Sequence, residues 1–229
     1  MGNTHGDKMK VEKNNKHAFW QALVFTIIIF ILGFILGFFL EVSRSNEVMF
    51  NVLESEVNLL DEQLRGKVIT DFNISCDVAV KNIFVFADRV YFEALEIENF
   101  QGAAKFTDDL KSTHKRYDLL RTMLWTESVK LREKCKEDFH TVVYLFNYNE
   151  EDIETKAKQL FFSRLLEDLK NKHSEEVLLI PIAVNLELDS VELAISKYQI
   201  NNLPAVIIDE EKVVDEVISF EDFERRVMG

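Results

Sequence analysis

The longest uninterrupted apolar stretch of the chain lies near its N-terminus. Residues 18–40 read AFWQALVFTIIIFILGFILGFFL, which is 23 residues without a formal charge. A helix of this length, at about 1.5 Å per residue, covers the roughly 30 Å hydrocarbon core of a bilayer. The alternative is a signal peptide, whose apolar region is normally about 7–15 residues and precedes a small-residue cleavage site. The pattern therefore predicts one uncleaved transmembrane helix at 18–40.

The cations that flank this span predict its orientation. Four lysines precede it: Lys8, Lys10, Lys13 and Lys16. Behind it only Arg44 lies close, between Glu41 and Glu47. Because cytoplasmic flanks carry the excess of Lys and Arg, residues 1–17 are expected in the cytoplasm and everything after Leu40 outside. The expected location is thus the cell membrane, crossed once, with the bulk of the chain extracytoplasmic.

Within the predicted span, Gly33 and Gly37 form a small-xxx-small pair. This spacing lets two transmembrane helices approach closely, so the pair is a candidate contact for a homo-oligomer.

Three apolar stripes at helical spacing follow the span. The first comprises Met49, Leu53, Val57, Leu60 and Leu64, with Gly66 as its expected stop. The second comprises Phe72, Cys76, Ala79, Ile83, Ala87, Val90, Ala94 and Ile97. The third begins at the N-cap candidate Thr107 and comprises Leu110, Thr113, Tyr117, Leu120, Leu124, Leu131 and Cys135. The break at Gln101-Gly102 predicts that the second and third helices form an antiparallel hairpin in a helical, coiled-coil-like region at 41–138.

From residue 139 the periodicity changes to alternating short strands and helices. Apolar runs predict strands at 141–146, 177–184, 205–208 and 213–218, the last two forming a hairpin around 209–212. Helical spacing is found at 151–172, 190–198 and 220–227. The order β-α-β-α-β-β-α predicts an α+β protein whose C-terminal domain, 139–229, is an α/β unit. A strand, helix and second strand form a parallel crossover, and Pro181 places the second strand at the sheet edge, since proline cannot donate to a ladder.

Composition and charge narrow the function classes. The chain has 229 residues with only 7 Gly and 2 Pro, which favours long helices. Its formal net charge is −13, and the part after the span is more acidic still because the tail is basic. An acidic body repels phosphate backbones, so nucleic acid is not an expected partner. The five histidines are too scattered for metal-ligand spacing, and no phosphate-binding glycine loop is found, so neither a metal nor a cofactor is expected.

Both cysteines fall on apolar helical stripes. They could be two buried free thiols that act as small hydrophobes. However, the predicted location is outside the cell, the two cysteines leave no unpaired one, and both lie far from the hairpin tip. The residue opposite Cys76 is expected near position 130, so a small helix shift would bring Cys135 into disulfide range. We therefore expect a structural Cys76–Cys135 bridge. Asn73-Ile-Ser is an N-glycosylation sequon that only an extracytoplasmic segment can use.

One motif in the C-terminal domain carries a family resemblance. The segment Asn201-Asn-Leu-Pro-Ala-Val-Ile-Ile follows a helix and precedes a hairpin. It resembles the segment that carries the cis-proline in the thioredoxin-like superfamily, with Leu203-Pro204 as that peptide bond. The resemblance covers residues 139–229. The combination of an anchor, a helical hairpin and such a domain also resembles membrane-anchored envelope proteins of prokaryotes.

The resemblance implies a dithiol site that this chain lacks. Thioredoxin-like oxidoreductases carry Cys-x-x-Cys after the first strand, where the helix N-terminus lowers the thiolate pKa. Here Glu150 and Ile153 occupy those positions, so dithiol exchange in this domain is excluded. Asn149 is the expected cap of the following helix, and Glu150, Glu151 and Asp152 are expected in its first turn. In active relatives the groove beside the cis-proline binds an extended polypeptide, which implies a groove here bordered by Tyr148, Asn149, Leu203 and Pro204.

These observations lead to one main hypothesis and two alternatives. The main hypothesis is a redox-inactive, non-enzymatic and membrane-anchored module that binds or scaffolds proteins outside the cytoplasm. The first alternative is a thiol-redox partner in envelope disulfide metabolism that uses Cys76 and Cys135. The second is a hydrolase built on the acidic cluster at Glu150, but no partner that perturbs a carboxylate pKa is evident from sequence.

Overall fold

A computed structural model describes residues 15–101, 107–135, 139–200 and 202–229, without the side chains of residues 15–18, 39–55, 58, 93–101 and 107–110. The described chain is a mixed α+β structure that divides into two units, residues 1–60 and 61–229. The N-terminal tail, the hairpin tip at Gly102 and the start of the cis-proline segment at Asn201 lie outside the described residues.

The first unit contains most of helix α1 (Asn15–Asp71), which continues into the second unit. Its segment Phe19–Phe38 is long and apolar enough to cross a membrane, a criterion that a signal sequence near the N-terminus also meets. The described side chains of this segment are exposed. The prediction of one N-terminal apolar helix that could anchor in a membrane is confirmed.

The expected helix stop at Gly66 is wrong, because α1 continues through Gly66 to Asp71. Gly66 instead lies close to helix α3 (Thr107–Cys135). A methyl group at Gly66 would overlap the Glu127 carboxylate, so the residue allows a close approach between two helices. The chain turns instead at residues 72–75, where Asn73 has a positive φ of 48°.

Helices α2 (Cys76–Gln101) and α3 (Thr107–Cys135) form the predicted pair and pack against each other. The stripe of α2 begins at Cys76 rather than at Phe72, which is exposed in the turn before it. The buried apolar residues of the pair are Ala79, Ile83, Phe86, Val90, Tyr117, Leu120, Leu124 and Leu131. Most of these belong to the predicted stripes.

The sheet contains β1 (His140–Phe146), β2 (Val177–Ala183), β3 (Ala205–Ile208) and β4 (Lys212–Val214) in the order β2-β1-β3-β4. β1 pairs with β2 in parallel, whereas β1 with β3 and β3 with β4 are antiparallel. β2 is therefore an edge strand, and the inference drawn from Pro181 is confirmed. β4 is shorter than predicted, because the exposed pair Asp215-Glu216 ends it.

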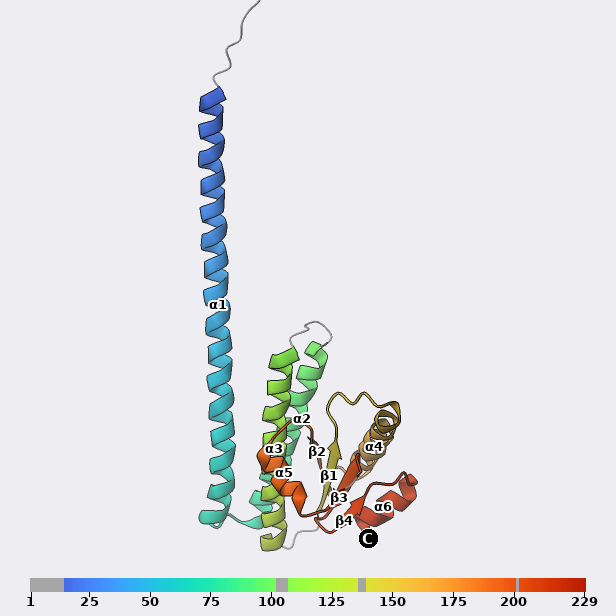
Figure 1. Cartoon of the computed structure of the whole chain (residues 1–229). Helices are drawn as coiled ribbons and strands as arrows, with labels where there is room; N and C mark the ends of the chain where they lie inside the picture. The colour runs from blue at the N-terminus through green and yellow to red at the C-terminus, as the bar shows by residue number, and fades with distance from the viewer. Residues whose placement is uncertain (1–14, 102–106, 136–138, 201) are drawn as a thin grey trace, which may run out of the picture. The chain divides into compact units, whose positions relative to one another are not determined.

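The sheet lies between two helical layers (Figure 1). α4 (Ile153–Lys172) and α6 (Phe220–Met228) cover one face, where they form a core with alternate strand residues such as Val142 and Tyr144. α3 and α5 (Asp189–Ser196) lie on the other face. The other residues of the central strands β1 and β3, such as Val143, Leu145 and Ile207, are buried there, so these two strands are apolar on both sides. The element order predicted for residues 139–229 is confirmed.

Helix α3 buries a second face that the sequence pattern does not reveal. Asp118, Thr122, Trp125 and Ser128 are all buried, and α3 contacts β1, β2 and α5. The Thr122 and Ser128 hydroxyls donate to the carbonyl oxygens of Asp118 (2.6 Å) and Trp125 (2.7 Å), so both are satisfied within the helix. The hairpin is thus part of the same compact unit as the sheet.

Candidate functional site

The candidate site lies at the edge of the sheet where β1 and β2 end. Phe146 and Ala183, the last residues of these parallel strands, are partners in the register. β3 runs antiparallel to β1 and begins at Ala205, which pairs with Leu145. The segment before β3 and the loops after β1 and β2 therefore meet at one edge, which we call the loop edge.

The loop between β1 and α4, residues 147–152, is held by two side-chain amides. The Asn147 N–H donates to Gln159 Oε1 (3.0 Å), and Gln159 Nε2 donates to the Asn147 carbonyl (3.1 Å). Asn185 holds Tyr148 in the same way, with distances of 2.7 and 2.9 Å. Because each amide satisfies both polar groups of one backbone residue, the loop has a fixed conformation without regular secondary structure.

Two carboxylates of this loop act as hydrogen-bond acceptors, in roles that differ from the prediction. Asp152 caps α4 by accepting from the Thr155 N–H (2.8 Å). Asn149 is not the cap; it has a positive φ of 52° and precedes Glu150. Glu150 accepts from Asn147 Nδ2 and from two backbone N–H groups. The cap moves to Asp152 because the helix begins at residue 153, so the acidic residues precede its first turn.

These hydrogen bonds lower the pKa of both carboxyl groups. For Glu150 the largest cause is the hydrogen bond from Asn147, followed by the Asp152 N–H. For Asp152 it is the backbone N–H of Thr155. The lowered pKa values keep both groups ionised near neutral pH, where they stabilise the loop as hydrogen-bond acceptors. Ile153, at the other position of the absent Cys-x-x-Cys motif, is exposed.

Tyr148 presents an aromatic surface at the loop edge. Its ring is half-buried and lies 4.3 Å, centroid to centroid, from the ring of His114 on α3. Burial, and secondly the charge of Arg121, lower the pKa of His114, so its imidazole is neutral near pH 7. Lys111 and Lys115 flank the pair, each 3.7 Å from the Glu187 carboxylate. The sequence gives no sign that Tyr148 and His114 meet, because the contact joins two separate elements.

The Leu203-Pro204 peptide bond is cis in the structure. Pro204 is buried and Leu203 is half-buried. Because Ala205 pairs with Leu145, this peptide bond lies at the loop edge, level with the end of β1. The fold therefore brings the two predicted groove segments, around Tyr148 and Pro204, to the same edge of the sheet. The loop after β2, with Asn185, was not predicted and joins them there.

Cys76 and Cys135 are joined by a disulfide with a Cα–Cα distance of 5.6 Å. They are the first residue of α2 and the last of α3, so the bond ties the open end of the hairpin. His114, which marks the loop edge on α3, is about 30 Å from Cys135 at the helical rise of about 1.5 Å per residue. The disulfide is therefore remote from the candidate site.

The remaining predicted site residues are exposed. Asn73 lies in the turn between α1 and α2, where a sequon is accessible. Gly33 and Gly37 lie on α1 with no other side chain or backbone near the position of a Cβ atom. Among the described residues, no group of three His, Cys, Asp or Glu side chains could hold a metal ion.

A second polar cluster, missed by the sequence analysis, lies at the opposite edge of the sheet. Arg132 on α3 contacts Asp209 (3.0 Å) and Glu210 (2.9 Å) in the β3–β4 turn. Glu210 also accepts from the Thr141 hydroxyl (2.6 Å) and from Trp125 Nε1 (3.0 Å). Asp209 and Glu210 have positive φ angles of 51° and 60°, which non-glycine residues rarely adopt. These contacts stabilise the turn and attach it to α3.

Arg132→Met is expected to lower the free energy of unfolding by about 2 kcal/mol, because the Asp209 and Glu210 carboxylates would lose the guanidinium group that joins them. His140, which contacts Asp209 at 2.7 Å, would remain. The side chains of Arg132, Asp209 and Glu210 are each at most 25% exposed, which keeps the loss below that of a fully buried pair. Urea unfolding of the full chain measures the effect. Arg164→Met, on the exposed face of α4, is the control and should change stability little. Equal stability of the two variants would show that the cluster contributes nothing.

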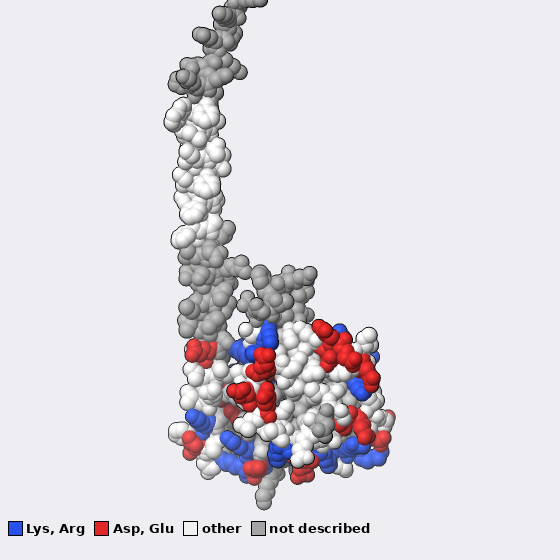
Figure 2. All heavy atoms as spheres, in the orientation of Figure 1, with Lys and Arg blue, Asp and Glu red and all other residues white. Residues whose placement is uncertain are grey.

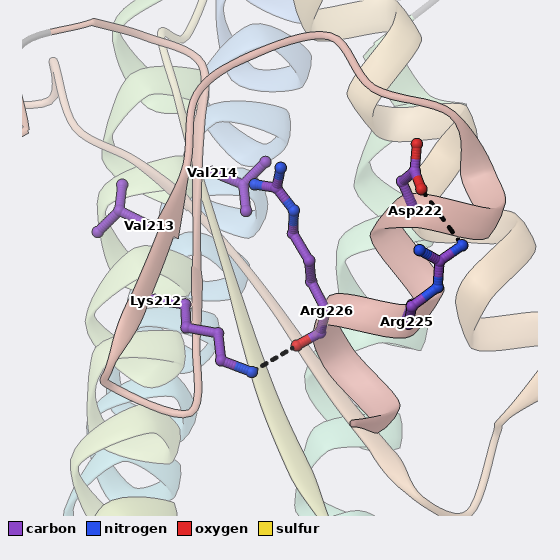
Figure 3. Close-up of a pocket in the computed structure, with 6 residues that line it drawn as sticks. All are labelled: Lys212, Val213, Val214, Asp222, Arg225 and Arg226. Atoms are coloured by element: carbon purple, nitrogen blue, oxygen red, sulfur yellow. Dashed lines mark hydrogen bonds and ion pairs between the residues drawn. The ribbon is translucent and has the colours of Figure 1, made fainter.

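A hollow of about 510 Å³ lies between β4 and α6, and Figure 3 shows the residues that line it. Lys212 Nζ donates to the Arg226 carbonyl (3.0 Å), and Arg225 contacts Asp222 (3.4 Å). The hollow is open, and its charged side chains are exposed. A lysine on an edge strand disfavours pairing with another strand, and this protection is the role that the geometry supports.

Figure 2 shows acidic and basic side chains interspersed over the visible face of the unit at 61–229, without one continuous basic area. Comparison of the chain with known protein families, with curated proteins and with solved structures finds no match.

Proposed function

We propose that the chain is a membrane-anchored module of thioredoxin-like topology that binds extended polypeptide segments at its loop edge and performs no dithiol chemistry. The observation that carries the proposal is the loop edge itself. It combines a thiol-free loop held by two side-chain amides, the half-buried Tyr148 ring packed on His114, and the Leu203-Pro204 segment before β3. The sheet order β2-β1-β3-β4 supports the topology.

The binding role is favoured over a hydrolase role by the state of the loop carboxylates. Glu150 and Asp152 have lowered pKa values because backbone N–H groups and Asn147 donate to them. A general acid needs a raised pKa and a general base needs a free lone pair directed at substrate. The lowered pKa values do not suit a general acid, and the hydrogen bonds give both carboxylates a structural role. The loop that they stabilise suits recognition by shape.

We place the unit at 61–229 outside the cytoplasm, with residues 1–17 inside. The basic tail supports this orientation, and so does the Cys76–Cys135 bridge, because disulfides persist mainly in oxidising compartments. The exposed turn at Asn73 is compatible with the same side of the membrane.

Tyr148→Ala is expected to weaken polypeptide binding at least tenfold, because it removes the aromatic platform beside His114. The measurement is fluorescence anisotropy of the full chain in lipid nanodiscs. The probe is a labelled polypeptide kept unfolded by carboxymethylation of its cysteines. Tyr91→Ala is the matched control, since Tyr91 is an exposed tyrosine on α2, and it should bind as the unaltered chain does. If Tyr148→Ala binds equally well, or if the unaltered chain does not bind the probe, the proposed function is wrong.

A further inference from the structure

The C-terminal part of α1 has a polar face directed into the unit at 61–229. Glu62 is only 3% exposed, although it is a carboxylate. It pairs with Arg65 and with Arg89 of α2, the latter at 2.9 Å. Arg65 in turn contacts Glu127 of α3 at 2.8 Å and lies over the Phe86 ring at 4.7 Å. Ion pairs and a cation–π contact therefore attach this turn of α1 to α2 and α3.

The opposite side of the same helix segment carries exposed apolar side chains, with the exposed Asp71 beside them at the end of the helix. Leu64 and Val68 lie near the C-terminal end of α1, and Phe72 continues their four-residue spacing in the turn directly after the helix. We call these three residues the outer stripe. Their exposed fractions are 59%, 43% and 75%. An amphipathic helix normally buries its apolar face and exposes its polar face, and here the arrangement is reversed. Within the described part of the chain, the outer stripe has no cover, which is typical of an interaction surface.

We propose that the outer stripe binds the outer stripe of a second copy of this chain, with the two α1 helices parallel. The apolar segment Phe19–Phe38 belongs to the same helix and can anchor in a bilayer. Two copies anchored in one membrane by this segment have the same orientation, which favours a parallel over an antiparallel pair. A two-fold axis between them makes each residue of the stripe face its own counterpart. Anchoring also raises the effective concentration of the partner.

Charges beside the outer stripe favour a parallel pair. Asp61 and Lys67 are both exposed. At about 100° per residue they lie roughly 60° to either side of Leu64, so the two charges flank the stripe at the level of this residue. In a parallel pair, the side of the stripe that carries Asp61 in one copy faces the side that carries Lys67 in the other copy. In an antiparallel pair, equal sides would meet and like charges would repel.

Cysteine cross-linking of the full chain in lipid bilayers tests the geometry. Leu64→Cys is expected to form at least ten times more covalent dimer under mild oxidation than Thr70→Cys, because Thr70 is exposed on the flank of the same helix. The native cysteines are already paired and stay in place. Equal cross-linking of the two variants, or none by Leu64→Cys, would overturn the proposal.

Energy transfer between labelled chains at increasing lipid dilution tests the strength of the contact. The double variant Leu64→Gln, Val68→Gln is expected to self-associate at least tenfold more weakly. The control Leu160→Gln, Leu193→Gln changes two exposed leucines elsewhere and should leave association unchanged. If Gly33→Leu, Gly37→Leu abolishes association while the outer-stripe variant does not weaken it, the span alone pairs the copies and the proposal is wrong. None of these variants touches Tyr148, so the outcome is independent of the proposed polypeptide binding.

Discussion

Replacing both Cys76 and Cys135 with alanine is expected to lower the free energy of unfolding by about 4 kcal/mol. The disulfide closes a loop with a sequence separation of 59. In the chain-entropy description, a cross-link of this length restricts the unfolded chain by about 4 kcal/mol at 25 °C. The effect should be large because the closed loop contains all of α2 and α3, against which the sheet packs.

Denaturant unfolding of the full chain, followed by far-UV circular dichroism, measures this loss. Reductant should destabilise the unaltered chain by a similar amount and should leave the double variant unchanged, which makes the variant its own control. A loss below about 1 kcal/mol would contradict a structural role for the bridge.

The same bridge distinguishes the redox alternative from the binding module. A disulfide that exchanges with partner proteins is reduced readily at the potential of its compartment, whereas a structural one resists reduction. The two sulfur atoms are at the open end of the hairpin, remote from the loop edge where the cis peptide bond lies. We therefore expect a glutathione buffer at extracytoplasmic potential to leave Cys76 and Cys135 oxidised. Rapid reduction there would support the redox role instead.

Much of the fold could be predicted from local patterns. The apolar span is identified by its length and lack of charge, and the start of α3 at Thr107 is marked by the break before it. Pro181 predicts an edge strand because the missing N–H of proline constrains pairing, and β2 is such a strand. In each case a single residue or a short period carries the information, and no distant partner needs to be known.

The predictions that fail depend on contacts between distant elements. Gly66 is typical of a helix stop in isolation, but it lies inside a continuous helix, where a Cβ atom would displace the Glu127 carboxylate of α3. The second buried face of α3 carries Asp118 and Ser128, whose polar side chains indicate a solvated surface until the sheet is in place. Hydrophobic periodicity cannot reveal a face that is buried through hydrogen bonds.

In the candidate site, too, features set by local sequence can be predicted and features that depend on distant contacts cannot. The positions of Glu150, Ile153 and the Leu203-Pro204 bond follow from element order alone. The exchange of the capping role from Asn149 to Asp152 depends on the exact start of α4, and helix boundaries are the least certain part of a sequence-based prediction. The Tyr148–His114 contact joins α3 to the β1–α4 loop, and only the packing of α3 on the sheet creates it.

Asp118 is expected to make the chain less stable as the pH rises. The carboxyl group is 1% exposed, and burial raises its pKa from 3.8 to about 6, while Arg121 and the Ala183 N–H act in the opposite direction. The folded state therefore binds the proton more tightly than the unfolded chain. The stabilisation from the protonated Asp118 carboxyl group is complete below about pH 4 and is lost as the pH rises through about 6. A difference of about 2 pKa units corresponds to about 3 kcal/mol.

Asp118→Asn should remove this dependence, because the amide resembles the protonated acid in shape and charge. We expect the variant to unfold with nearly constant free energy from about pH 4 to 7, apart from the other titrating groups. At pH 7.5 the variant should be about 2 kcal/mol more stable than the unaltered chain. This gain is smaller than about 3 kcal/mol, because the variant also loses the ion pair between Asp118 and Arg121 at 3.2 Å. Thermal and urea unfolding at matched pH values measure both quantities.

Asp168→Asn, on the exposed surface of α4, serves as the matched control and should follow the unaltered chain at every pH. The sign of the result is decisive, because an ionised Asp118 paired favourably with Arg121 would make the asparagine variant less stable at pH 7.5. The buried oxygen Oδ2 of Asp118 has no hydrogen-bond partner in the described structure, which favours the protonated form. Asp118 therefore limits stability at neutral pH at the position where α3 meets the end of β2, next to the loop edge.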